Sequence, residues 1–296
     1  MVKRLWLIGL LSLVLVGFLE FSVRGADVAV PLESMMSSFG LPVMKQSSEQ
    51  ALRPDESGGP ADFQVTFAAA IAQSAPNYVP REETALADPT NYGDRFATDV
   101  YGRPVYNDFI AVLHETVGSA QSAINTFRTP HPRDDDQVSY HALIAQDGTV
   151  IYIVPPEKRA FGAGNSVFNG PQGPETVLTN RQFPPSVNNF AYHVSLETPS
   201  DGRGNSRTHS GYTQAQYESL AWLLARTTIP ENRITTHRIV DRSGNRMDPR
   251  SFDTTKFLTL LRRYPSRAGL AAAEFTERSL ELAQQEGGLS PSRSRF

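Results

Sequence analysis

The sequence predicts an α/β fold in which a mixed central β-sheet is covered by helices on both faces. Residues 109–113 form a continuous apolar run, which is typical of a strand buried on both faces. Asp147-Gly148 lies between two strand-like runs and indicates a hairpin, because a tight hairpin turn needs a positive φ. Helical segments lie between the other strands, and this alternation favours a sheet covered by helices.

The elements can be placed in order along the chain. Strands are expected over residues 109–113, 138–145, 149–154, 190–197 and 233–236. Helices are expected over residues 63–74, over 117–128, after Thr213, around 257–261 and over 268–286. Gln216 completes a capping-box pattern with Thr213, and Pro230 ends that helix. Residues 84–104 are expected to be loop-like, and no internal repeat is present in the sequence.

Composition excludes several classes of protein. The chain has 296 residues, 28 Lys and Arg against 31 Asp and Glu, and a formal net charge of −3. This balance argues against a nucleic-acid partner, which a basic patch would attract. The sequence contains no cysteine, so disulfides, thiolate metal sites and a cysteine nucleophile are excluded. A hydrophobic content of 40% suits a globular protein of one or two domains.

The N-terminus predicts export. Lys3 and Arg4 precede an apolar segment over residues 5–18. As a helix this segment is about 21 Å long, shorter than the roughly 30 Å hydrocarbon core of a bilayer. It therefore indicates a signal peptide, cleaved after Gly25, and a protein that works in the periplasm or is secreted. The alternative is an uncleaved anchor extended by Phe21 and Val23, which would be the only contact with a membrane.

Two of the six histidines close predicted strands. His114 follows the apolar run 109–113, and His237 follows the run 233–236. Ligands of open α/β sheets gather beyond strand ends, and Asp248 follows soon after His237. Two imidazoles and one carboxylate would leave the fourth position of a tetrahedral Zn²⁺ open for water. The alternative for each histidine is an ordinary hydrogen-bonded residue at the end of a strand.

Competing motifs are incomplete. His114-Glu115 begins like a zincin helix, but Gly118 stands where the second histidine is required. Gly162 and Gly164 begin a dinucleotide fingerprint, but Val167 replaces its third glycine. The sequence contains neither a Gly-x-Ser-x-Gly elbow nor a P-loop, so those hydrolase and nucleotide-binding signatures are absent.

Five short motifs occur in this order along the chain: His114-Glu115-Thr116, Ser139-Tyr140-His141, Asp147-Gly148-Thr149, Val194-Ser195-Leu196-Glu197, and His237 with Asp248-Pro249. As an ordered set they resemble the zinc-dependent N-acetylmuramoyl-L-alanine amidases of the type 2 amidase family. These share a fold with phage amidase lysozymes and peptidoglycan recognition proteins. The resemblance covers about half of the chain, roughly residues 108–252.

The resemblance implies roles for particular residues. The matching zinc ligands are His114, His237 and Asp248, and the matching catalytic residues are Glu197, Tyr140 and Arg246. Glu197 stands for the glutamate of a Gly-Ile-Glu motif, and Arg246 falls where many members have a lysine. The alternatives are a structural salt bridge for Glu197, core packing for Tyr140, and an ion pair that orients Asp248 for Arg246. His141 is expected to contact substrate or to support a ligand, and His131 and His209 to lie on the surface.

The sequence also departs from the family pattern. Ser195 and Leu196 replace glycine and isoleucine in the glutamate motif, and Arg246 gives up a proton less readily than lysine. Residues 161–164 read Phe-Gly-Ala-Gly, where the family often has Trp-His-Ala-Gly, so a histidine is missing.

The resemblance implies an exported zinc enzyme that cleaves the amide between N-acetylmuramic acid and L-alanine in peptidoglycan or a muropeptide. Two alternatives remain: a non-catalytic peptidoglycan-binding module, and a zinc peptidase acting on another wall amide. The expected organisation is a signal peptide over 1–25, an N-terminal extension and linker over 26–104, a zinc amidase domain over 105–265 with its cleft at the strand ends, and a C-terminal helix and tail over 266–296.

Overall fold

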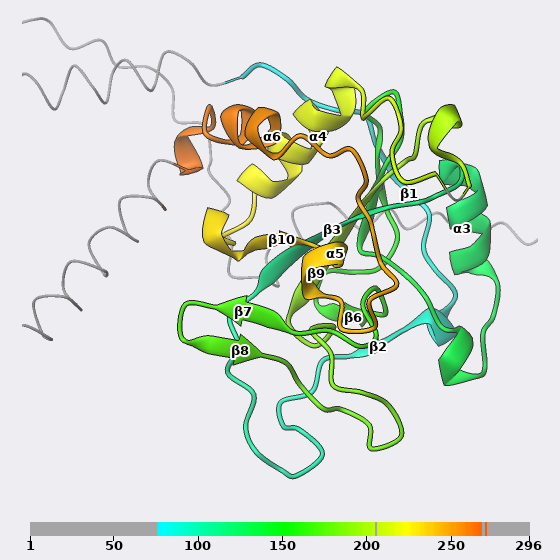
Figure 1. The fold of residues 1–296 in the computed structure, drawn as a ribbon, viewed down its shortest axis with the longest axis vertical. Coiled ribbons are helices and arrows are strands. Elements are labelled where there is room, and N and C mark those ends of the chain that lie inside the picture. Colours follow the sequence, from blue (N-terminus) through cyan, green and yellow to red (C-terminus); the bar gives the residue numbers. More distant parts are fainter. Residues whose placement is uncertain (1–75, 205, 268–269, 271–296) are drawn as a thin grey trace, which may run out of the picture.

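The centre of the molecule is a six-stranded mixed sheet. A computed structural model describes residues 76–204, 206–267 and 270 (Figure 1). Across the sheet the strands are β1 (Glu82–Thr84), β5 (Val150–Tyr152), β4 (Ala142–Ile144), β9 (Ala191–Leu196), β3 (Ile110–Glu115) and β10 (Ile234–Thr236). β4 and β5 are antiparallel and every other neighbouring pair is parallel. The predicted mixed α/β sheet and its hairpin are confirmed, and Gly148 has the positive φ of 87° that the turn requires.

Two small sheets and several helices complete the fold. β2 (Tyr92–Asp94) pairs with β6 (Lys158–Ala160), and β7 (Phe168–Gly170) pairs with β8 (Gly173–Glu175). The α-helices are α3 (Ala120–Arg128), α4 (Gln214–Ala225), α5 (His237–Val240) and α6 (Thr254–Leu261). Short 3-10 helices span Pro89–Asn91, Asp134–Asp136, Ser200–Gly202 and Glu231–Arg233. Within the described residues, no helix has the length and apolar character needed to cross a membrane.

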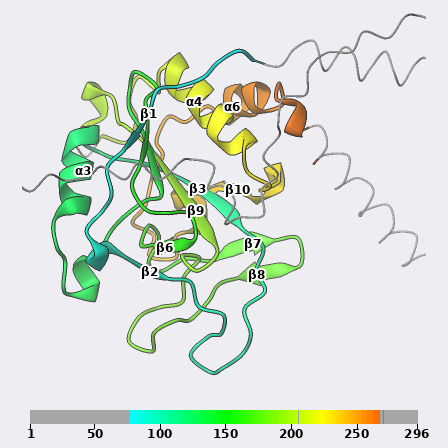
Figure 2. The same ribbon diagram turned by 180° about the vertical axis from the view of Figure 1, so that it is seen from behind.

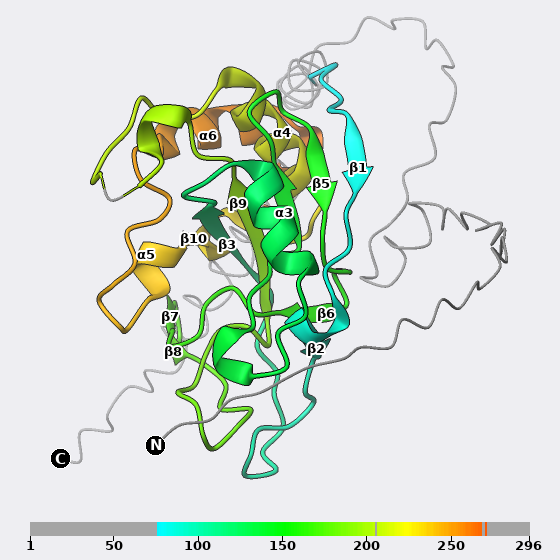
Figure 3. The same cartoon turned by 90° about the vertical axis from the view of Figure 1, so that its right-hand side faces the viewer.

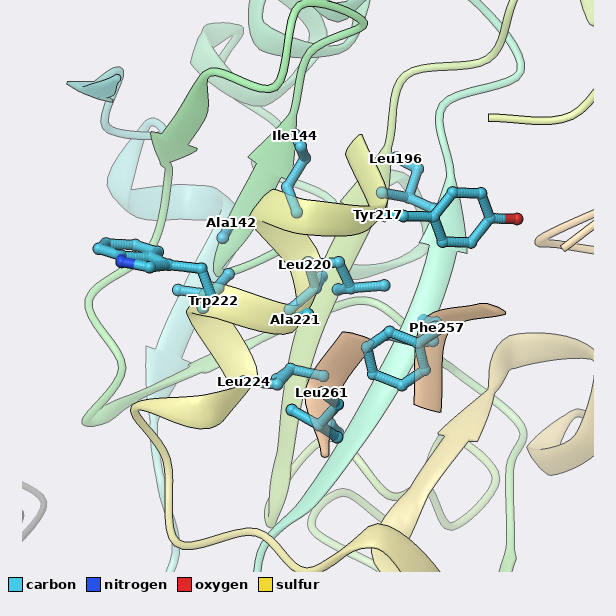
Figure 4. Packing of buried hydrophobic residues seen from close by; sticks show 14 of the residues in the cluster. Ala142, Ile144, Leu196, Tyr217, Leu220, Ala221, Trp222, Leu224, Phe257 and Leu261 are labelled. Atoms are coloured by element: carbon cyan, nitrogen blue, oxygen red, sulfur yellow. The ribbon is translucent and has the colours of Figure 1, made fainter. Parts of the chain in front are cut away.

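Helices cover both faces of the sheet, as expected. Ile144 packs with α4 and α6 in one core cluster, whereas its neighbour Leu143 packs with α3 in another. Successive strand residues point to opposite faces, so α3 lies on the other side of the sheet from α4 and α6 (Figures 2 and 3). Figure 4 shows Leu220 and Leu224 of α4 beside Phe257 and Leu261 of α6 over the sheet.

Local signals set where the helices begin. Thr213 and Gln216 form the predicted capping box at the start of α4. α3 starts later than residue 117, because the Ser119 side chain caps it by accepting from the Ser122 backbone N–H. Val117, between β3 and this cap, has a positive φ of 58°, which no helix residue can adopt.

The folded unit extends to the N-terminal side of residue 105, where the sequence placed the start of the catalytic domain. β1 is an edge strand of the main sheet, and β2 pairs with β6. Glu82, Glu83 and Thr84 carry no apolar side chain, so backbone pairing with β5 rather than a hydrophobic pattern makes this strand. The predictions for residues 1–25 and 63–74 lie outside the described residues, as does the predicted helix over 268–286 apart from residue 270.

Candidate metal centre

Strand pairing brings two of the predicted ligands side by side. β3 and β10 are parallel neighbours in which Leu113 pairs with Thr236. His114 follows Leu113 and His237 follows Thr236, so the two histidines lie at the same carboxyl edge of the sheet. The Arg238 backbone N–H donates to the carbonyl of Asp248 at 2.9 Å, which holds the following loop against α5. The three predicted ligands therefore converge from β3, α5 and the loop after it.

The geometry of the cluster suits a divalent metal ion. Asp248 Oδ2 lies 3.2 Å from His114 Nδ1 and 3.0 Å from His237 Nδ1. The three candidate donor atoms all lie within 4.8 Å of one another. Tetrahedral Zn²⁺ with bonds of about 2.0–2.2 Å separates its ligand atoms by about 3.3 Å. Two imidazole nitrogens and one carboxylate oxygen are also the donors that zinc prefers, so these residues fit the ion that the sequence predicts.

The electrostatic environment keeps these groups in the protonation states that bind metal. Burial lowers the pKa of His114 to about 4, and its side chain has no solvent exposure. Burial raises the pKa of Asp248, but the hydrogen bonds with His114 and His237 outweigh this effect and hold the pKa below its usual value. At neutral pH the cluster therefore presents a neutral imidazole at His114 and a carboxylate at Asp248, the forms that act as metal ligands.

Tyr140 lies against the cluster, and Arg246 lies at its exposed side. The Tyr140 ring stacks on the His114 ring with centroids 4.4 Å apart and also meets Phe127 edge-on. Burial, with the charge of Asp248, raises the pKa of Tyr140, so its hydroxyl stays protonated. Arg246 is exposed, and its guanidinium has no hydrogen bond or ion pair among the described residues. Its charge nevertheless lowers the pKa of His114, which places it within electrostatic range of the cluster.

Glu197 does not join this cluster in the structure. Its carboxylate accepts from the Gln146 backbone N–H at 3.1 Å and lies 3.4 Å from the Arg203 guanidinium. It lines a separate pocket of about 390 Å³ together with Arg81. The β9 residue in register with His114 is Ser195, whose buried hydroxyl has no hydrogen-bond partner among the described residues. The catalytic role that the sequence gives Glu197 stays a prediction.

A buried histidine that the sequence left without a role lies directly behind His114. His193 Nδ1 is 2.9 Å from His114 Nε2, and neither side chain is exposed. His141 supports His193 in turn, because its Nδ1 accepts from the His193 backbone N–H at 2.9 Å. No hydrogen bond between His141 and the cluster is found in the described residues. The sequence did not reveal that His193 is buried, because the alternation of side chains along a strand does not show which face of the sheet is covered.

His209 is the clearest correction to the sequence prediction. Its side chain has no exposure, and its Nε2 lies 3.2 Å from Glu115 Oε2. Polar neighbours in the sequence suggested a surface residue, but the loop that carries His209 folds over the end of β3. His131 keeps partial exposure, with its Nδ1 2.8 Å from Asn91 Oδ1.

His141 is expected to make the protein sensitive to acid. Burial, with a contribution from Arg95, lowers the pKa of His141 to about 3, against about 6.5 in an unfolded chain. Between these values the unfolded state binds a proton that the folded state does not, so stability present above pH 6.5 is lost as the pH falls, by about 1.4 kcal/mol per pH unit. We expect the free energy of unfolding in urea to fall between pH 7 and pH 5 by about 2 kcal/mol less in the metal-free His141→Gln variant than in metal-free wild type. An identical pH dependence in both proteins would contradict this assignment.

A mixed sheet with two imidazoles and a carboxylate at its strand ends is typical of a metallohydrolase domain. Residues 106–251 match the family model described as N-acetylmuramoyl-L-alanine amidase, the type 2 amidase family. A search of curated proteins finds no match.

Several solved structures are similar to the chain. A selenomethionine derivative of AmpD is 24% identical, with a TM-score of 0.43, and the match covers 62% of this chain and 96% of that one. AmpD from Citrobacter freundii, solved in solution, is 24% identical with a TM-score of 0.37, covering 62% and 90%. The endolysin amidase LysCS from Clostridium intestinale is 17% identical with a TM-score of 0.36, covering 63% and 98%.

Proposed function

We propose that this protein is an exported zinc amidase that hydrolyses the amide bond between N-acetylmuramic acid and L-alanine in peptidoglycan or its fragments. The observation that carries the proposal is the convergence of His114, His237 and Asp248 within a domain of the amidase family. Two imidazoles and one carboxylate leave zinc an open coordination position, which is the arrangement of catalytic rather than structural zinc sites.

The chain's own residues supply the rest of the chemistry. When bound, zinc activates water and polarises the scissile carbonyl. The Arg246 guanidinium is exposed and has no partner among the described residues, so it is available to bind the negative charge that develops on the carbonyl oxygen. Tyr140 keeps its proton and stacks on His114, so its hydroxyl is a second donor for the same oxygen. Losing one such donor typically costs about 100- to 1,000-fold in rate.

The direct test is the reaction itself. Purified protein loaded with zinc is incubated with peptidoglycan, and the products are separated and sequenced. An amidase releases peptides that begin with a free L-alanine and leaves the glycan strands intact. A zinc peptidase acting on another wall amide would instead release peptides with a different first residue, and that product would overturn the proposed bond specificity.

One observation favours a second candidate, a peptidoglycan-binding module without catalysis. Glu197, for which the resemblance implies a catalytic role, has its carboxylate bonded to Gln146 and Arg203 and is not part of the metal cluster. Such a module would bind sedimented peptidoglycan in the presence of zinc and release no peptide. Turnover by wild-type protein excludes this candidate.

Glu197→Gln tests which of the two roles Glu197 has. We expect zinc content to be unchanged and turnover to change little, because the carboxylate lies in the pocket with Arg81 and Arg203. A general base contributes typically about 100- to 10,000-fold. A loss of that size, with zinc retained, would restore the role that the family motif implies and would require Glu197 to leave its present partners during the reaction.

Export is part of the same proposal. It is supported by Lys3 and Arg4 followed by the apolar segment 5–18. N-terminal sequencing of the protein recovered from a cell fractionation tests it. A mature chain that begins at Ala26 supports cleavage after Gly25, whereas an intact chain in the cytoplasm would contradict export.

A further inference from the structure

His193 occupies the place behind one of the candidate metal ligands. It lies on β9, its side chain has no solvent exposure, and its Nδ1 is 2.9 Å from Nε2 of His114. We propose that His193 is a positioning residue that fixes the tautomer and ring orientation of His114, and that Gly162 is required because it leaves the space that the His193 ring fills. This inference rests on the metal centre proposed above.

The hydrogen-bond roles follow from the geometry. His114 turns Nδ1 toward Asp248 Oδ2, 3.2 Å away, so this is the nitrogen whose lone pair serves a metal. The His114 proton then sits on Nε2 and is donated to His193 Nδ1. A partner on the second nitrogen of a metal-binding histidine sets its tautomer and raises its basicity. His193 supplies that partner through Nδ1, and its side chain has no solvent exposure.

The remaining nitrogen of His193 shows what the arrangement costs. With Nδ1 as an acceptor, His193 carries its proton on Nε2, and this buried atom has no hydrogen-bond partner among the described residues. An unsatisfied buried donor costs about 1–3 kcal/mol. An apolar residue at position 193 could fill the core without the cost of an unsatisfied Nε2–H. The contact between Nδ1 and His114 therefore explains why position 193 is a histidine.

The His193 ring also packs against His141. The backbone N–H of His193 donates to His141 Nδ1, and the backbone N–H of His141 donates to the His193 carbonyl, each at 2.9 Å. The two rings stack with centroids 5.8 Å apart and planes within 6°. His141 and the β4–β9 contact therefore fix the direction in which His193 presents Nδ1.

Gly162 matches His193 from the neighbouring loop. A Cβ built on Gly162 would lie 2.6 Å from His193 Nδ1 and 2.7 Å from its Cγ, closer than real contacts allow. Gly162 does not have a positive φ, so an alanine there would not strain the backbone. Its side chain would instead clash with the His193 ring. At Gly164, in the same loop, an added Cβ meets nothing within 4 Å. The two glycines form a matched pair for an experiment.

The first experiment compares Gly162→Ala with Gly164→Ala. The zinc dissociation constant is measured by competition with a chromogenic chelator, and thermal unfolding of each metal-free protein is recorded alongside. We expect Gly162→Ala to bind zinc about 10- to 100-fold more weakly, which is the usual effect of disturbing a ligand's outer partner. Gly164→Ala should bind like wild type. Wild-type affinity in Gly162→Ala would overturn the role of Gly162.

Variants of His193 itself separate hydrogen bonding from packing. His193→Leu fills similar space without an acceptor, whereas His193→Asn places an oxygen on the same side-chain branch as Nδ1. We expect weak zinc binding in His193→Leu and recovery toward wild type in His193→Asn, with Ser195→Ala, on the same face of β9, unchanged. Wild-type affinity in His193→Leu, or equal losses in both His193 variants, would overturn the inference while leaving the proposed metal centre intact. Equal zinc binding by wild type and His114→Ala would instead remove the metal centre itself.

Discussion

Asp248→Ala is expected to abolish zinc binding and peptidoglycan hydrolysis together. Asp248 Oδ2 is the atom that lies close to both candidate imidazole ligands, at 3.2 Å and 3.0 Å. Without it, two histidines remain to hold the ion, and the loss of affinity should exceed the roughly 100-fold that follows loss of an outer partner. Zinc content after dialysis and the rate of peptide release measure the two effects on the same sample.

A stability readout makes the Asp248 result independent of activity. A metal that binds only the folded state stabilises it by about 2.7 kcal/mol when present at about 100 times its dissociation constant. Zinc should therefore raise the unfolding temperature of wild type and leave that of Asp248→Ala unchanged. Asp135→Ala removes an exposed carboxylate on the Asp134–Asp136 turn and should behave like wild type. Zinc stabilisation that persists in Asp248→Ala would put the ion elsewhere.

The two histidines of this site could be anticipated because each has a local signal. His114 follows an uninterrupted apolar run, and His237 follows a short β-forming segment, so both stand at strand ends in the sequence alone. What the sequence does not contain is the pairing of β3 with β10, which places Leu113 opposite Thr236 and so brings the histidines together. That pairing comes from packing between distant segments. Only the family resemblance, and not the local sequence pattern, grouped the two histidines in one site.

The position of Glu197 depended on a register that local patterns do not specify. β9 pairs with β3 so that Ser195, and not Glu197, lies beside His114. Two residues along a strand correspond to about 6.6 Å, enough to move a carboxylate from a metal site to a different pocket. Because side chains alternate along a strand, His193, Ser195 and Glu197 fall on one face of the sheet, but this alternation does not rank them by distance from His114.

Glu115→Ala is expected to destabilise the metal-free protein by about 3–5 kcal/mol. The Glu115 side chain is 1% exposed, and its carboxylate accepts hydrogen bonds from the backbone N–H and the guanidinium of Arg250, whose side chain is 4% exposed. Removing the carboxylate leaves a buried guanidinium without its counter-charge, which is the costly case for a buried ion pair. The free energy of unfolding in urea measures the effect.

Glu115 and Arg250 also connect the two segments that carry metal ligands. Glu115 follows His114 on β3, and Arg250 lies just beyond Asp248 in the loop after α5. Arg250 further donates to the Gly202 carbonyl at 2.6 Å, so its guanidinium needs both its acid and its backbone partners to stay buried. If an uncompensated charge is the cause of the instability, Glu115→Leu combined with Arg250→Met should unfold less readily than Glu115→Ala, because no buried charge is left unpaired. A double variant at least as unstable as Glu115→Ala would mean that Glu115 and Arg250 stabilise the fold through their hydrogen bonds rather than through charge compensation. In that case zinc affinity should fall in both the single and the double variant, because Asp248 would no longer be held against His114.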